Sequence, residues 1–109
     1  MTSPTQRSLK ILRDLGFTAQ IVEKYNMFAH VRQDLFGFID IVAIHPKHKG
    51  VFGIQTTTQT HVAEHIEKIK ANPIHKLWIK TGNKLIVHGW AKRGKAKKRK
   101  IWSVKEIEI

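Results

Sequence analysis

Hydrophobic positions near the start of the chain follow helical spacing. Leu9, Leu12 and Leu15 form an apolar stripe, and a glycine follows the last of them. Residues 3 to 6, Ser-Pro-Thr-Gln, combine the spacing of a capping box with proline at the first helical position. The pattern therefore predicts a first helix at about residues 4 to 15.

The next apolar positions alternate with polar ones, as side chains do along a strand. Residues 17 to 24 alternate in this way and predict a first strand. Residues 38 to 45 and 51 to 56 are rich in Ile, Val and Phe, and the polar segment 46 to 50 separates them. We expect these two segments to pair as a β-hairpin.

Helical spacing returns after residue 60. Val62, Ile66 and Ile69 lie on one stripe, and Thr60 is placed to cap a helix that carries it. Asn72 precedes a proline, and a residue in that position resists helical backbone. The sequence therefore predicts a second helix that ends near Asn72.

Three more strands are predicted after this helix, at residues 76 to 80, 85 to 90 and 101 to about 107. The expected order of elements is αβββαβββ. Strands this apolar need cover on both faces, so the sequence favours an α/β fold in which two helices flank a central mixed sheet. With 109 residues and 41% hydrophobic content, residues 1 to 109 are expected to form a single domain.

Composition argues against several classes of protein. The chain has no cysteine, so it can form neither a disulfide framework nor a thiolate zinc site. Its first ten residues lack an apolar signal core, and no apolar run is long enough to cross a bilayer. We therefore expect a soluble protein of the cytoplasm.

Charge changes the picture most. The chain has 20 Lys and Arg against 8 Asp and Glu, a net charge of +12 with a pI near 10.3. Such an excess on a small chain favours a nucleic-acid partner over solubility alone. An anionic membrane surface is a poorer match, because no expected helix combines a basic face with bulky exposed hydrophobic side chains.

Basic residues are densest in the segment 91 to 100, which has seven cations in ten positions. It is expected to form a basic hairpin or arm that contacts phosphates without reading sequence, or else a localisation signal or a solvated loop. The expected nucleic-acid-binding residues are Lys92, Arg93, Lys95, Lys97, Lys98, Arg99 and Lys100. The three tryptophans alternate within apolar segments and are expected in the core or on a sheet face, although one could stack on a splayed base.

A polar cluster is expected at one end of the hairpin. Asp40 interrupts an apolar strand, and Gln55 and Thr57 share one face of the next. Pairing of the two strands would bring Asp40 beside Gln55. A buried aspartate needs partners, and the alternative to a functional role is that Asp40 accepts hydrogen bonds from loop amides or from Arg32.

These motifs resemble a known nuclease core. The sequence GFIDIVAI, a turn, GVFGIQTTT and a helix are similar to the PD-(D/E)XK nuclease superfamily, most closely in layout to its Holliday-junction resolvase-like branch. The resemblance covers about residues 4 to 80 and implies a restriction-endonuclease-like core. The family's aspartate falls on Asp40, its second acidic residue on Gln55 and its lysine on Thr57. An extra glutamate of the resolvase-like members corresponds to Gln6.

The resemblance implies a metal site. Mg²⁺ or Mn²⁺ would be held by Asp40, the amide oxygen of Gln55 and the main-chain carbonyl of Thr56, and would activate a water for phosphodiester cleavage. The catalytic set would be Asp40, Gln55 and Thr57. The site has lost a carboxylate, which Glu23 could restore. It has also lost a lysine.

A cation from a neighbouring element could replace that lysine, and we consider Lys24 and Lys68. The segment that precedes Asp40 supplies another polar group. His30, Arg32 and Asp34 could bind phosphate or position a metal there, or Asp34 could simply cap a turn.

A competing motif is His61-Val-Ala-Glu64-His65, which has the H-x-x-E-H spacing of inverzincin metalloproteases. A zinc protease would need a third ligand, for which only Glu106 or Glu108 follows. Chance explains the spacing better, since the chain has seven histidines.

The expected function is therefore metal-dependent, structure-selective cleavage of DNA, branched or single-stranded. The alternative is a catalytically inactive DNA- or RNA-binding module that keeps the nuclease fold. The resolvase-like proteins act as dimers, so the resemblance also implies a homodimer.

Overall fold

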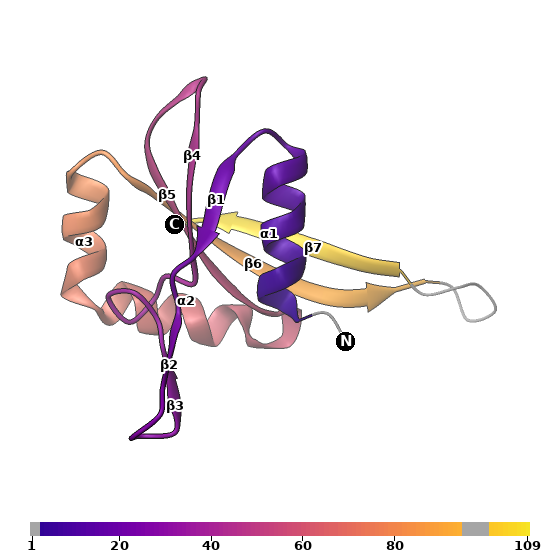
Figure 1. Ribbon diagram of the computed structural model, residues 1–109, viewed down its shortest axis with the longest axis horizontal. Helices are drawn as coiled ribbons and strands as arrows, with labels where there is room; N and C mark the ends of the chain where they lie inside the picture. Colours follow the sequence, from indigo (N-terminus) through magenta and orange to yellow (C-terminus); the bar gives the residue numbers. More distant parts are fainter. Residues whose placement is uncertain (1–2, 95–100) are drawn as a thin grey trace.

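The computed structural model describes residues 3–94 and 101–109, which form a layered α/β structure (Figure 1). A five-stranded mixed sheet lies at the centre, in the order β1-β4-β5-β6-β7, and a separate two-stranded sheet pairs β2 with β3. The elements are α1 (Pro4–Asp14), β1 (Thr18–Ile21), β2 (Lys24–Asn26), β3 (Val31–Gln33), β4 (Ile41–His45), β5 (His48–Thr58), the 3₁₀ helix η1 (Gln59–His61), α2 (Val62–Ala71), α3 (Pro73–Lys80), β6 (Lys84–Arg93) and β7 (Ile101–Glu108). None of the helices among these residues has the length and apolar character needed to cross a membrane.

Two apolar clusters hold the layers together. On one face of the sheet, Leu9 and Leu12 of α1 pack on side chains of β1, β4 and β5, among them Ile41 and Ile54. On the other face, Val62 and Ile69 of α2 pack on β6 and on the segment that leads into β4, and Trp78 of α3 packs against the same cluster. The expected sheet with helices on both faces is confirmed.

The expected order αβββαβββ is wrong, because residues 76 to 80 form part of a third helix and not a strand. The Asn72 side chain accepts a hydrogen bond from the Ile74 amide at 3.0 Å, and Pro73 occupies the first helical turn. The same Asn-Pro pair thus ends α2 and starts α3.

Two local predictions also change. Residues 17 to 24 do not form one strand, because β1 ends at Ile21 and β2 begins a separate hairpin with β3. Thr60 does not cap α2: it lies inside η1, and its hydroxyl is 3.0 Å from that of Thr58.

The β4–β5 hairpin was expected and is observed. Its antiparallel register pairs Ile41 with Ile54, and the Asp40 amide continues the ladder by donating to the Ile54 carbonyl at 2.9 Å. Asp40 therefore lies opposite Gln55, one step before β4 begins. Beyond β5, the parallel strand β6 covers the other edge of the hairpin and pairs Gln55 with Val87.

A buried polar group ties α1 to β6. Ser8 Oγ accepts a hydrogen bond from Trp90 Nε1 at 2.8 Å and lies 2.9 Å from His88 Nδ1. Because this hydroxyl already accepts from Trp90, its own hydrogen is free to be donated to a neutral His88 ring. Burial lowers the pKa of His88 below its ordinary value of 6.5, and Glu106 opposes that shift.

This burial predicts acid lability. The folded state resists protonation of His88, so the stability due to the neutral ring is present above about pH 6.5 and is lost as the pH falls below that value. We expect His88→Phe to lose less unfolding free energy than wild type between pH 7.5 and 5, measured by urea denaturation. His30→Gln, which changes an exposed histidine, should keep the wild-type pH dependence. Equal losses in wild type and His88→Phe would contradict this assignment.

Candidate functional site

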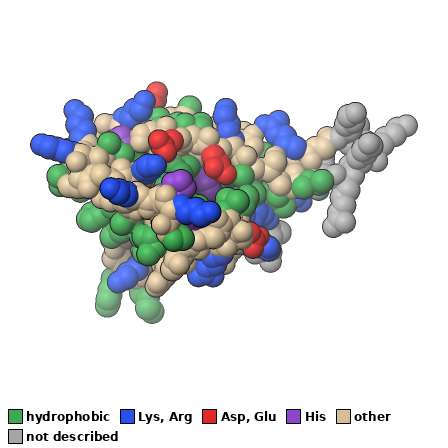
Figure 2. Space-filling view, turned by 90° about the horizontal axis from the view of Figure 1, so that it is seen from above, with side chains coloured by type: hydrophobic (Ala, Val, Ile, Leu, Met, Phe, Trp, Pro, Cys, Tyr) green, Lys and Arg blue, Asp and Glu red, His purple; other side chains and the backbone are tan. Residues whose placement is uncertain are grey.

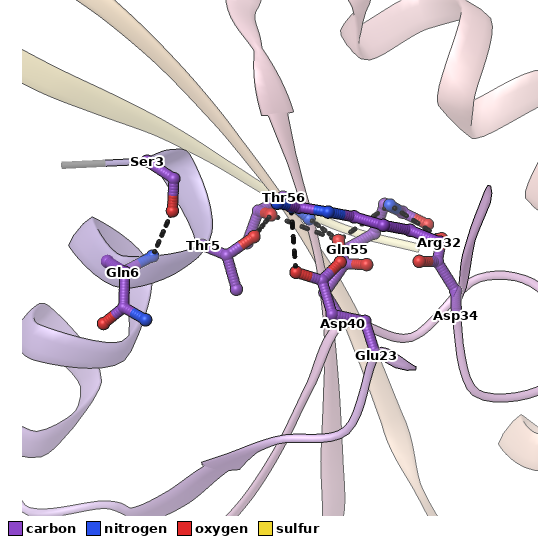
Figure 3. A network of polar contacts seen from close by, with 9 residues as sticks. All are labelled: Ser3, Thr5, Gln6, Glu23, Arg32, Asp34, Asp40, Gln55 and Thr56. Carbon is purple, nitrogen blue, oxygen red and sulfur yellow. Dashed lines mark hydrogen bonds and ion pairs between the residues drawn. The ribbon is translucent and has the colours of Figure 1, made fainter. Parts of the chain in front are cut away.

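Asp40 is the buried centre of a polar site, with 3% of its surface exposed. Its Oδ2 accepts hydrogen bonds from Gln55 Nε2 at 2.9 Å, from the Thr56 amide at 2.8 Å and from Thr56 Oγ1 at 3.1 Å (Figure 3). The expected proximity of Asp40 and Gln55 is therefore observed. All three donors belong to β5. Arg32, which was considered as an alternative partner of Asp40, lies beside Glu23, with Arg32 Nη1 3.5 Å from Glu23 Oε1.

Two further carboxylates complete the site. Glu23 precedes β2 and Asp34 follows β3, so the two residues stand at the base of one hairpin. One carboxylate oxygen from each of Glu23, Asp34 and Asp40 lies within 4.8 Å of the others. Gln55 Nε2 also lies 3.5 Å from Asp34 Oδ2, so this amide faces two carboxylates. Both acids that sequence reasoning named as additional candidates are thus brought to Asp40.

Burial, and then the neighbouring acids, change how Asp40 ionises. Burial raises the pKa of Asp40 to about 9, and a hydrogen bond shared with the Asp34 carboxyl acts in the same direction. The Thr56 amide opposes the shift, and the negative charges of Asp34 and Glu23 add to it. Without a cation, Asp40 therefore holds a proton at neutral pH.

The first helix approaches the site through Thr5. Thr5 Oγ1 lies 2.8 Å from Thr56 Oγ1, so α1 is tied to the strand that supplies the Asp40 donors. Figure 3 shows Thr5 turned toward Thr56, while the Gln6 side chain points away from Asp40. The cavity at the site has a volume of about 280 Å³, and its lining residues are Ser3, Pro4, Thr5, Glu23, Arg32, Asp34, Asp40, Gln55 and Thr56.

Thr57, which the resemblance to the nuclease superfamily places at the lysine position, is not in this lining. Thr57 is buried and pairs with Gly89 of β6. Lys68 lies on α2 and pairs with Glu64 at 3.6 Å, while Lys24 lines an adjoining hollow. Among the described residues, the cation in the cavity lining is Arg32, which the sequence indicated as part of a polar segment and as an alternative partner of Asp40.

A second hollow lies beside Trp102, which is 40% exposed. The Arg7 guanidinium stacks on its ring, 3.6 Å from the centroid, and Lys92 Nζ lies 5.3 Å from it. Trp90 is buried instead, and the Trp78 indole donates to the Lys84 carbonyl at 2.8 Å. Trp102 is thus the tryptophan with a ring available beside cations.

The expected basic arm is only partly described. Lys92 and Arg93 lie at the end of β6, and Arg93 donates to the Gln59 side chain. Lys95, Lys97, Lys98, Arg99 and Lys100 lie outside the described residues. Figure 2 shows Lys and Arg side chains spread over the face in view, with acidic side chains scattered among them.

Three hollows adjoin one another around the start of α1. The hollow beside Trp102, about 410 Å³, shares Gln6 with an intermediate one of about 270 Å³. The intermediate hollow shares Thr5, Glu23 and Arg32 with the cavity at Asp40. The three hollows therefore follow one another as a strip, from Trp102 of β7 through the hollow beside the base of the β2–β3 hairpin to the acidic cavity. Arg7 and Lys92 lie near its β7 end.

The H-x-x-E-H motif does not assemble a metal site in the described part of the chain. His61 Nδ1 lies 3.5 Å from Glu64 Oε2 on the surface. Glu106 of β7, which was considered as a third ligand, lies opposite His88 of β6. Within residues 3–94 and 101–109, the group of three potential ligands that lie together is Glu23, Asp34 and Asp40.

Comparisons with protein-family models, with curated proteins and with solved structures found no match for this chain.

The raised pKa of Asp40 predicts that, in the absence of divalent ions, stability falls as the pH rises from about 4 to about 9. Between the ordinary value of 3.8 and about 9, the folded state holds a proton that the unfolded state releases. The stabilising contribution is complete below pH 3.8 and declines as pH rises toward 9, by at most about 1.4 kcal/mol per pH unit. Asp40→Asn should reduce this slope in urea denaturation between pH 5 and 9, whereas the surface variant Glu67→Gln should keep it. An unchanged slope in Asp40→Asn would contradict the shift.

Proposed function

We propose that the protein binds nucleic acid and hydrolyses phosphodiester bonds in DNA with Mg²⁺ or Mn²⁺, as a PD-(D/E)XK-type endonuclease. The observation that carries this proposal is the cluster of Glu23, Asp34 and Asp40. Three of only eight acidic residues meet within 4.8 Å on a chain of net charge +12. Such repulsion is costly to maintain and is relieved when a cation binds.

The donor set fits a hard divalent ion. Carboxylates of Asp40, Asp34 and Glu23 supply the oxygen ligands that Mg²⁺ and Mn²⁺ prefer. The second acid of the family motif is Gln55 here, and the two hairpin-base acids supply the missing charge. Gln55 directs its nitrogen at Asp40 and Asp34, so it serves as a metal ligand only if its amide turns over.

The remaining residues have defined tasks in this proposal. A divalent ion held by these carboxylates would polarise a phosphate oxygen and lower the pKa of a bound water. Gln55 and Thr56 hold the Asp40 carboxylate in place through three hydrogen bonds. Arg32 offers a permanent positive charge in the cavity wall to a phosphate, which Thr57 cannot do. Arginine is no proton acceptor, so its contribution is electrostatic.

Binding is supported by the strip that joins the three hollows. Arg7 and Lys92 flank Trp102 near one end, and Lys24 and Arg32 lie near the other. Cations along a groove beside an exposed aromatic ring suit a nucleic-acid backbone with a base free to stack. The order of helix, hairpin and helix around the mixed sheet is also compatible with a restriction-endonuclease-like core.

One observation favours a second candidate, a nucleic-acid-binding module without catalysis. Asp40 is neutral at pH 7 in the metal-free state, and all three of its hydrogen bonds from β5 are satisfied. Thr57 stands where the nuclease superfamily has its lysine and offers no positive charge. Such a site can persist in the fold without being catalytically active. Cleavage assays distinguish the two candidates.

The test of the proposed function is a nicking assay on linear, single-stranded and branched DNA with Mg²⁺ or Mn²⁺. We expect Asp40→Asn and Asp34→Asn to lower cleavage about 100-fold, the effect of removing one electrostatic group from a catalytic site. Glu67→Gln, on the surface of α2, should cleave as wild type does. Mn²⁺ should raise the melting temperature of wild type but not of Asp40→Asn. DNA binding without cleavage in either metal would select the non-catalytic module, and cleavage that survives Asp40→Asn would place the activity elsewhere.

The strip also predicts a specific salt dependence. If Arg7 neutralises one phosphate, Arg7→Gln should reduce the slope of log affinity against log salt by about 0.9 for duplex DNA. Lys70→Gln, an exposed cation on α2 and outside the strip, should change it less. Fluorescence anisotropy between 50 and 200 mM salt, about the range in which phosphate contacts are resolved, measures both slopes. Equal slopes for the two variants would remove Arg7 from the binding surface.

A further inference from the structure

The β2–β3 hairpin projects from the body of the molecule as a ribbon of its own (Figure 1). Its turn presents two large apolar side chains to solvent: Met27 is 74% exposed and Phe28 is 99% exposed. Tyr25 and Val31 on the two strands are also exposed. Single exposed hydrophobic residues are common on protein surfaces, but four on one short hairpin mark an interaction site.

The turn is held in a defined conformation. Asn26 Oδ1 accepts hydrogen bonds from the Phe28 and Ala29 amides, both at 3.0 Å, and Tyr25 Oη lies 3.4 Å from His30 Nδ1. These bonds fix the backbone that carries Met27 and Phe28. A preorganised tip loses less conformational entropy when it binds.

The hairpin starts and ends at the acidic site. Glu23 directly precedes β2 and Asp34 directly follows β3, and both belong to the carboxylate cluster. Phe28 follows Glu23 by five positions. At a strand rise of about 3.3 Å per residue, the tip therefore stands roughly 15 Å from the carboxylates. A molecule held by the tip is therefore placed at a fixed distance from the site.

The charge of the hairpin identifies the kind of partner. Residues 24 to 33 contain Lys24, His30 and Arg32 and no acidic residue. Cations on the stalk match phosphates, and Phe28 at the tip matches the face of a base. A second copy of the chain fits less well, because each copy has a net charge of +12 and two tip side chains fall far short of the roughly 800 Å² per partner of a stable interface.

We propose that the β2–β3 hairpin is a wedge that enters the base stack of DNA. Phe28 and Met27 insert at an unstacked step, and Lys24 and Arg32, near the base of the hairpin, contact phosphates closer to the acidic site. Insertion of apolar side chains between bases is an established way for proteins to open a duplex. Bases at a branch point or mismatch are already partly unstacked, so the wedge selects such DNA and presents it to the acidic site. This inference rests on the proposed binding of nucleic acid.

The test compares wild type with Phe28→Ala on DNA that carries 2-aminopurine at a branch point or mismatch. The variant changes a fully exposed side chain, so the fold is retained. We expect its affinity for branched DNA to fall about tenfold, the effect typical of losing one base–aromatic stack, while its affinity for a continuous duplex stays within about twofold. The 2-aminopurine signal that wild type produces should disappear. Leu77→Ala, which removes a 59% exposed apolar side chain from α3, is the matched control and should behave as wild type.

The outcomes separate the wedge from the function on which it rests. If wild type binds DNA and Phe28→Ala binds branched DNA with the same affinity and signal, the wedge is overturned while the proposed function stands. If wild type binds no DNA, both are overturned. If sedimentation shows a dimer that Phe28→Ala dissociates, the tip is a protein contact, and this also overturns the wedge.

Discussion

The buried carboxylate of Asp40 is the constraint on which the arrangement of the site depends. Its Oδ2 takes three hydrogen bonds from two consecutive residues of β5, Gln55 and Thr56. A slip of one residue between β4 and β5 would turn these donors to the wrong faces and leave a buried polar group without partners. The pair Asp40–Gln55 therefore fixes the register of the hairpin and, through Thr56 and Thr5, the approach of α1.

The same constraint accounts for an amide, and not a further carboxylate, at position 55. Asp34 and Glu23 already bring two carboxylates to Asp40, and a glutamate at position 55 would add a fourth. Gln55 instead donates toward both Asp40 and Asp34, which offsets part of their repulsion. Under the proposed function, negative charge has moved from β5 to the base of the β2–β3 hairpin, and the oxygen-rich character of the site is kept.

Sequence reasoning predicted the elements that follow from the alternation of apolar and polar residues along strands. It failed where a helix cap or the pairing of distant residues decides the structure. The β4–β5 hairpin and the contact of Asp40 with Gln55 follow from a period of two, and both are observed. The apolar run at residues 76 to 80 is too short to distinguish helix from strand, and the Asn72 cap decides for a helix.

The β2–β3 hairpin was missed because its apolar side chains face solvent and give no core pattern. Glu23 and Asp34 were noted singly, but only the pairing of the strands between them places both at Asp40. Gln6 was expected at the site, but Thr5 reaches it and Gln6 points away, because neighbouring helix residues differ by about 100° around the axis.

A site of this kind couples the binding of anion and cation. Cations along the strip attract phosphates, yet the three carboxylates in the acidic cavity at one end of it repel them while they remain charged. A proton on Asp40 relieves part of this repulsion, and a divalent ion relieves more of it and can contact the phosphate as well. The two ligands therefore favour one another's binding under the proposed function, since each lowers the electrostatic cost that the other meets. In this way a strongly basic chain can keep an acidic cluster within its proposed binding surface.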